Sequence, residues 1–349
     1  MTPHGPARRL VGSLVLGPAA GLAAWLVAAA PVAAHGTFDP TPPTLWILAS
    51  GWQFDPTVAI PLALTAVGWL WVVDRIDKRH PHNPVPLRRT IAFLLGLFAI
   101  AVALQSGIER YDTTLFSIHM VQHLLLLLVA PPLLLIGAPV TQLLRVASPW
   151  VRRRVLLPIL ESTPVAIASH PVTAWLAFIL VLWLSHFSPL FDLALENPPV
   201  HQLEHLLYLV VALLFWFPVV GADPARHRLG YPARALYLLA AMPPSSFLAM
   251  ELLFAGTPLY HHYLTLNAPY GIDALVDQQA AAAIMWIASD VTFIGAILLI
   301  IGAWMRHEER RSAETESRTD LERAALASRA DRLAALRAAE RADGEVGRR

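Results

Sequence analysis

The sequence predicts an all-α membrane protein, a bundle of seven transmembrane helices that follows an N-terminal signal peptide or extra helix. Of the 349 residues, 56% are apolar, and the mean hydropathy is +0.53. Apolar runs of about 18 residues or more recur along the chain, which is the length a helix needs to cross a bilayer. The loops that join these runs alternate between basic and acidic composition, as the loops of multi-span membrane proteins do.

The first apolar run is typical of a secretory signal peptide. It extends from Leu10 to about Ala30 behind a pair of arginines, and small residues close it at Ala34. A basic start, an apolar middle and a small-residue end mark a cleaved signal. We therefore predict a signal peptide at residues 1–34, with a retained first transmembrane helix as the alternative.

Seven further spans should form the membrane domain at residues 35–305. They are predicted, in chain order, at about residues 55–73, 90–108, 115–138, 171–190, 203–221, 235–255 and 278–304. The loops after the first, third and fifth of these spans hold nearly all of the arginines that lie in loops between spans, so the positive-inside rule places them in the cytoplasm. The protein should then lie in the plasma or inner membrane, with the mature N-terminus outside and the C-terminus in the cytoplasm.

The last segment differs in composition from the rest of the chain. Residues 306–349 are rich in alanine, arginine and glutamate, with leucines spaced loosely as a helical stripe. Such a composition favours a charged, solvated helix on the cytoplasmic side.

Seven histidines lie at the predicted outer ends of the spans, and they indicate a metal site. They are His119, His123, His186, His201, His205, His261 and His262. Imidazole near hydrocarbon is unfavourable unless it is paired or bound. Two of the pairs have i, i+4 spacing, which puts both rings on one helical face and suits chelation of one ion. We predict that His119, His123, His186, His201 and His205 bind the metal.

Several other polar residues are predicted to support this site. The chain has no cysteine, so a metal must use imidazole, thioether, carboxylate or backbone ligands. Carboxylates within membrane spans are functional candidates, although Asp290 is better interpreted as a structural hydrogen bond between helices. The supporting residues are Glu204, Met250, Glu251, His261, His262, Asp277, Gln278 and Asp290. A proline pair at Pro131-Pro132 should interrupt the helix that carries His119 and His123.

Several motifs together resemble a known family. His119-Met-Val-Gln-His123, followed by Val129-Ala-Pro-Pro-Leu-Leu-Leu-Ile-Gly-Ala-Pro139, resembles the signature of the seven-helix CtaG family of cytochrome c oxidase assembly factors of the caa3-oxidase type. Further matches are Leu184-Ser-His-Phe, Phe191-Asp, Val200-His-Gln-Leu-Glu-His-Leu-Leu, Pro258-Leu-Tyr, Asp277-Gln-Gln, Ile284-Met-Trp286 and Asp290. The resemblance covers about Leu45 to Trp304. It departs at Ala280–Ala283, where the family tends to have glycines.

The resemblance implies a membrane protein that helps a haem–copper oxidase to mature, with oxidase subunits as its partners. Carried over by position, the family's marked residues would be His119, His123, His186, His201, Glu204, His205, Asp277 and Gln278. Copper is the expected cargo, because imidazoles bind both of its oxidation states and a site without thiolates releases its ion more easily. No catalytic residue and no nucleic-acid partner are expected.

Three other functions are compatible with the histidine pattern. The histidine pattern is also similar to that of membrane di-iron oxidoreductases, which use histidine boxes, although those sites face the cytoplasm. Imidazoles from two helices could instead ligate a haem. A scaffold that assembles the oxidase without holding any metal is the third.

Overall fold

The structure, a computed structural model, describes residues 41–346, and the regular secondary structure within that range is helical throughout. The predicted all-α class is therefore confirmed. The predicted signal peptide lies outside the described residues. The chain divides into two compact units, with the boundary between Gly295 and Ala296.

Six helical segments within residues 41–346 are long and apolar enough to cross a membrane. They are α3 (Pro56–Arg79), α4 with α5 (Leu87–Gln105 and Gly107–Tyr111), the run α6–η1–α7–α8 (Phe116–Leu124, Leu125–Val129, Ala130–Ile136 and Pro139–Val146), α14 (Pro198–Val220), α15 (Tyr231–Phe254) and α17 (Ala274–Val346). Each of them overlaps a predicted span. Shorter helices connect them: α2 (Leu45–Ser50), α9 (Pro149–Val151), η2 (Arg152–Leu156), α10 (Leu157–Leu160), α11 (Thr163–Ala168), α16 (His261–Thr265) and η3 (Pro269–Gly271).

The remaining predicted span is shorter than expected. Helix α12 (Pro171–His186) ends four residues before the predicted limit, and α13 (Leu190–Glu196) follows it at an angle of 70°. Pro189 lies in the break, and the residue before a proline avoids the helical conformation. The pair makes a seventh membrane span only if both helices are taken together as one broken span.

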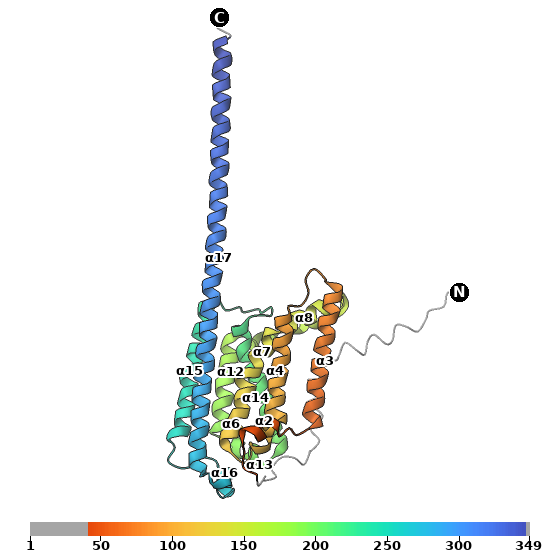
Figure 1. The fold of residues 1–349 in the computed structure, drawn as a ribbon, viewed down its shortest axis with the longest axis vertical. Helices are drawn as coiled ribbons and strands as arrows, with labels where there is room; N and C mark the ends of the chain where they lie inside the picture. The colour runs from red at the N-terminus through yellow and green to blue at the C-terminus, as the bar shows by residue number, and fades with distance from the viewer. Residues whose placement is uncertain (1–40, 347–349) are drawn as a thin grey trace, which may run out of the picture. The chain divides into compact units, whose positions relative to one another are not determined.

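Helices α4, α7, α12 and α14 pack side by side in the first unit (Figure 1). Helix α14 contacts both α7 and α12, while α3 covers the other side of α4. The closest approach is between α4 and α7, where a Cβ on Gly96 would lie 2.9 Å from the backbone nitrogen of Leu134. Because real Cβ atoms do not come so close, only glycine allows this contact. Phe93, one turn before Gly96, stacks on Trp69 of α3 with ring centroids 4.0 Å apart.

The predicted interruption at the proline pair is a π turn. Helix α6 passes into the π-helical turn η1 and then into α7, in which Pro131 is the second residue. Proline has no N–H, so the carbonyl of Leu127, four residues earlier, lacks its helical donor. The indole Nε1 of Trp216 in α14 donates to this carbonyl at 2.9 Å. The irregular turn is thus satisfied by a neighbouring helix, as buried backbone in a membrane requires.

In the second unit the helix continues from Ala296 to Val346. All side chains from Trp304 to Leu326 are exposed, and i, i+4 ion pairing occurs between Arg318 and Glu322. These features agree with the solvated helix expected for the charged segment.

Candidate metal centre

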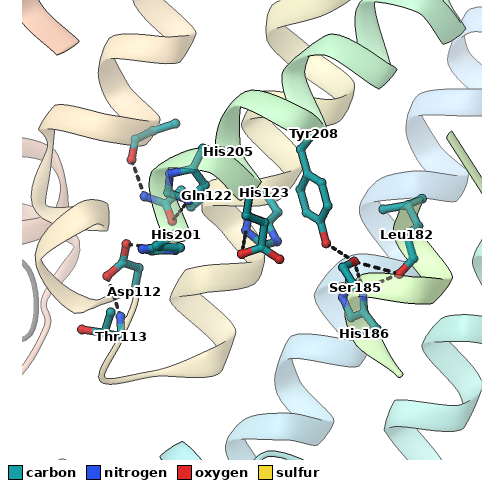
Figure 2. Close-up of polar contacts among 12 residues, drawn as sticks. Asp112, Thr113, Gln122, His123, Leu182, Ser185, His186, His201, His205 and Tyr208 are labelled. Atoms are coloured by element: carbon teal, nitrogen blue, oxygen red, sulfur yellow. Dashed lines mark hydrogen bonds and ion pairs between the residues drawn. The ribbon is translucent and has the colours of Figure 1, made fainter. Parts of the chain in front are cut away.

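Four of the predicted histidines come together between two helices. His119 and His123 lie one turn apart on α6, and His201 and His205 lie one turn apart on α14. The ring centroids are 4.1 Å apart for the α6 pair, 4.2 Å for the α14 pair and 5.2 Å for His119 with His201. None of the four is more than 4% exposed. Figure 2 shows the rings of His123, His201 and His205 from this cluster.

Two sets of ligand atoms are close enough to hold a metal ion. In the first, which we call the Glu204 group, one atom from each of His119, His123, His201 and Glu204 lies within 4.8 Å of the others. In the second, the Asp112 group, the same holds for Asp112, His201 and His205. His201 belongs to both groups.

Asp112 was not predicted from the sequence. It follows α5 in the loop before α6, and an aspartate in such a loop usually faces water. Here it is 1% exposed, and its Oδ2 atom lies 3.9 Å from Nε2 of His201. Burial holds the pKa of the Asp112 carboxyl well above its usual range, because the ionised form is poorly solvated there. Its position in the sequence could have indicated this role, because Asp112 lies four residues before α6, the helix that carries the His119 and His123 pair.

Several ligand atoms of the cluster have no hydrogen bond from the residues that the structure describes. They are both ring nitrogens of His119, both ring nitrogens of His123, Oε2 of Glu204 and Oδ2 of Asp112. A buried polar atom left without a partner costs about 1–3 kcal/mol, and native proteins contain few of them. Their concentration at one point indicates a ligand that satisfies them together.

The spacing of these atoms fits a small cation. Nε2 of His123 lies 3.9 Å from Oε2 of Glu204, the same distance that separates His201 from Asp112. This separation is too long for a hydrogen bond. Two ligand atoms that share a transition metal at about 2.1 Å lie up to roughly 4.2 Å apart. The geometry therefore suits an ion between the partners better than direct contact.

Gln122 orients His205. The amide nitrogen of Gln122 donates to the Ala103 carbonyl at 3.0 Å and to Oε2 of Glu109 at 2.5 Å. The amide oxygen of Gln122 is therefore the atom that faces Nε2 of His205, at 3.0 Å, and it accepts the hydrogen bond from that ring. Nε2 of His205 must therefore carry the hydrogen, and Nδ1 keeps the lone pair that can bind a metal.

A comparison with models of known protein families identifies the family of this chain. The family model described as "Cytochrome c oxidase caa3 assembly factor" matches residues 67–307. The chain belongs to this family. The resemblance predicted from the motifs is thereby confirmed.

The chain also has curated relatives. It is 32% identical over 286 residues to uncharacterised proteins of Mycobacterium bovis and Mycobacterium tuberculosis, and 29% identical over 289 residues to one of Mycobacterium leprae. In each case the similarity covers 80% of this chain and 43% of the relative, so the chain spans less than half the length of these relatives. No solved structure matches significantly.

His186, the fifth predicted ligand, belongs to neither group. Its Nδ1 lies 2.8 Å from the Leu182 carbonyl, which can only accept, so Nε2 carries the lone pair and has no hydrogen bond from described residues. The ring lines a cavity of about 20 Å³ together with His123, Met120 and Met285. A cavity of this size holds about one water molecule. His186 and His123 therefore line the same cavity.

The predicted Asp277-Gln278 pair hydrogen-bonds to backbone groups of α6, of α15 and of the segment that follows α15. The Asp277 carboxylate accepts the backbone N–H of Phe116 at 2.6 Å and that of Ser117 at 3.3 Å, so it caps the N-terminus of α6. Gln278 donates to the Leu252 carbonyl and accepts from the Leu259 N–H. Both residues act on the backbone, and neither reaches the ligand groups.

Of the predicted His261-His262 pair, His262 hydrogen-bonds to the loop that carries Asp112. Nε2 of His262 donates to the Thr113 carbonyl at 2.8 Å, and the hydroxyl of Tyr263 donates to the Asp112 carbonyl at 3.1 Å. His261 is exposed and takes part only through its backbone N–H, which donates to Asp192. Helix α16 therefore holds Asp112 in place without supplying a ligand to either group.

The three remaining predicted residues lie on other parts of the bundle. Glu251 is exposed and Met250 is half-buried on α15, and neither joins the Glu204 group or the Asp112 group. Asp290 accepts hydrogen bonds from Trp286 Nε1 at 2.9 Å and from Ser246 Oγ at 3.4 Å. It links α17 to α15, which matches its interpretation as a structural hydrogen bond.

Proposed function

We propose that this assembly factor holds one copper ion at the Glu204 group and delivers it to a subunit of a haem–copper cytochrome c oxidase. The observation that carries the proposal is the convergence of four buried ligand atoms from α6 and α14 within 4.8 Å. Family membership supports the role in oxidase assembly.

The chemistry of the donors supports copper as cargo. Three imidazoles and one carboxylate are borderline ligands that accept copper in either oxidation state. Zinc and iron would also accept such ligands, so a metal assay must distinguish them. Without a thiolate, the site binds the ion less tightly than a cysteine site does, and a delivery protein has to release its cargo.

Metal analysis of the purified, detergent-solubilised protein tests the proposal. After copper loading, we expect about one ion per wild-type chain, and its loss in the His119→Ala/His123→Ala variant. The His170→Ala/His227→Ala variant is the matched control, because these two rings lie 4.6 Å apart at the opposite end of the bundle. Equal copper in all three proteins, or in none, would refute the copper site. Tightly bound iron would instead favour an oxidoreductase, and a Soret band would favour a haem protein.

The proposal also includes a topology. We propose seven spans, with α12 and α13 forming the broken fourth one, and an outward-facing metal centre. The support is the positive-inside distribution of arginines at the opposite end of the bundle. Because the chain has no cysteine, single cysteines can be introduced at two exposed glutamates, Glu196 and Glu161. An impermeant maleimide added to intact cells should label Glu196→Cys and spare Glu161→Cys, whereas the reverse pattern would refute the orientation.

A further inference from the structure

The Glu204 group and the Asp112 group share one ligand, His201, and this limits how they can be used. A neutral imidazole has one nitrogen lone pair, because its other nitrogen carries a hydrogen. A single His201 therefore ligates one ion at a time. His205, whose Nε2 hydrogen-bonds to Gln122, belongs to the Asp112 group only.

We propose that the two groups are successive positions of one copper ion, which moves between them while it stays bound to His201. The inference rests on the proposed function, since it concerns the route of the same ion. In the transfer, Asp112 and His205 are exchanged for His119, His123 and Glu204. Each group contains one carboxylate, so the ligand charge around the ion is the same in both positions. The exchange makes and breaks metal–ligand bonds only and needs no electron donor.

Within the proposed topology, the Asp112 group is the one that includes a residue of an outer loop. Asp112 lies in the loop between α5 and α6, while the other ligands lie inside α6 and α14. The loop is held by α16 through the hydrogen bonds that His262 and Tyr263 donate to backbone carbonyls. Its carboxylate oxygen Oδ2 has no hydrogen bond from described residues and faces His201. An ion that enters or leaves through this loop therefore meets Asp112 before it meets Glu204.

The Asp112→Asn variant tests this route with little structural change. Oδ1 of Asp112 accepts the Thr113 N–H, and asparagine retains this acceptor while it loses the second carboxylate oxygen. Asp223→Asn is the matched control. Asp223 is another buried aspartate, 2% exposed, which accepts the N–H groups of Val140 and Thr141 at the start of α8.

The measurements are copper stoichiometry by mass spectrometry and the rate at which excess EDTA removes the ion, both on the full chain in detergent. We expect one ion in the wild type and in Asp112→Asn, with release from Asp112→Asn slowed about tenfold or more, which is the size of effect that ligand-shell changes produce. Asp223→Asn should release copper at the wild-type rate. His205→Gln, which also removes a ligand of the Asp112 group only, should slow release in the same way if Asp112→Asn does not fold.

Three outcomes would overturn the proposal. Two ions per wild-type chain would show two independent sites, and unchanged release rates in Asp112→Asn and His205→Gln would show that the ion does not pass the Asp112 group. A wild-type protein that binds no copper would remove the proposed function, and the route with it. The first two results leave the proposed function standing, so the two failures are distinguishable.

Discussion

Asp277 caps a helix that is not its own, and its removal should measure how firmly α6 is held. Helix α6 begins at Phe116 behind Leu115, whose side chain cannot accept a hydrogen bond. The Asp277 carboxylate from α17 supplies that acceptor to two N–H groups and is 6% exposed. Asp277→Ala would leave the N–H of buried Phe116 and that of half-buried Ser117 without this acceptor.

The magnitude follows from these contacts. Loss of an N-terminal cap costs about 1 kcal/mol on average, and burial of an unsatisfied donor adds about 1–3 kcal/mol. We expect Asp277→Ala to lower the free energy of unfolding by about 2–4 kcal/mol. Asp277→Asn keeps one carbonyl acceptor and should lower it by about 1 kcal/mol.

The assay is reversible unfolding in mixed detergent micelles, followed by tryptophan fluorescence, with Asp273→Ala as the control. Asp273 is exposed and caps its own helix, α17, through the N–H groups of Leu275 and Val276. Its replacement should cost about 1 kcal/mol or less. If Asp277→Ala were no more destabilising than Asp273→Ala, the capping of α6 by Asp277 would be refuted. A shift of α6 should also weaken copper binding in Asp277→Ala alone.

Three further predictions concern packing and ligand orientation. Gly96→Ala should destabilise the bundle by about 1–3 kcal/mol through overpacking between α4 and α7. Gly68→Ala adds a Cβ that meets open space and should not destabilise it, so equal effects of the two substitutions would contradict the close approach of α4 and α7. Gln122→Leu removes the acceptor that orients His205, so it should slow copper release about tenfold, as His205→Gln should, and Gln142→Leu at the opposite end should leave the release rate unchanged. Trp216→Phe should cost about 1–3 kcal/mol in unfolding free energy, because it leaves the carbonyl freed by the proline pair without a donor; an unchanged stability would count against that bond.

The helices were largely predictable because their cause is local. Each long apolar run within residues 41–346 forms helix that overlaps its predicted position, since a backbone in hydrocarbon must satisfy its own hydrogen bonds. The exception is also local. The predicted fourth span ends at His186 instead of residue 190, and Pro189 explains the break.

The metal centre was predictable only in part. Helical periodicity put His119 with His123, and His201 with His205, on common faces of their helices. Periodicity within one helix could not show that these two faces meet, that His186 belongs to neither ligand group, or that the Asp112 side chain points from its loop toward His201. Those relations depend on how α6, α12 and α14 pack against one another.

By itself, the sequence determined the helical class, the apolar segments, the two chelating pairs and the family to which the chain belongs. These follow from composition, from the helical repeat and from motifs that are contiguous in the chain. Only the tertiary structure decided the ligand groups, the partner of Asp277 and the donor that satisfies Leu127. Each of these joins residues that are far apart in the sequence. Such pairs are selected by the packing of whole helices, which no local pattern encodes.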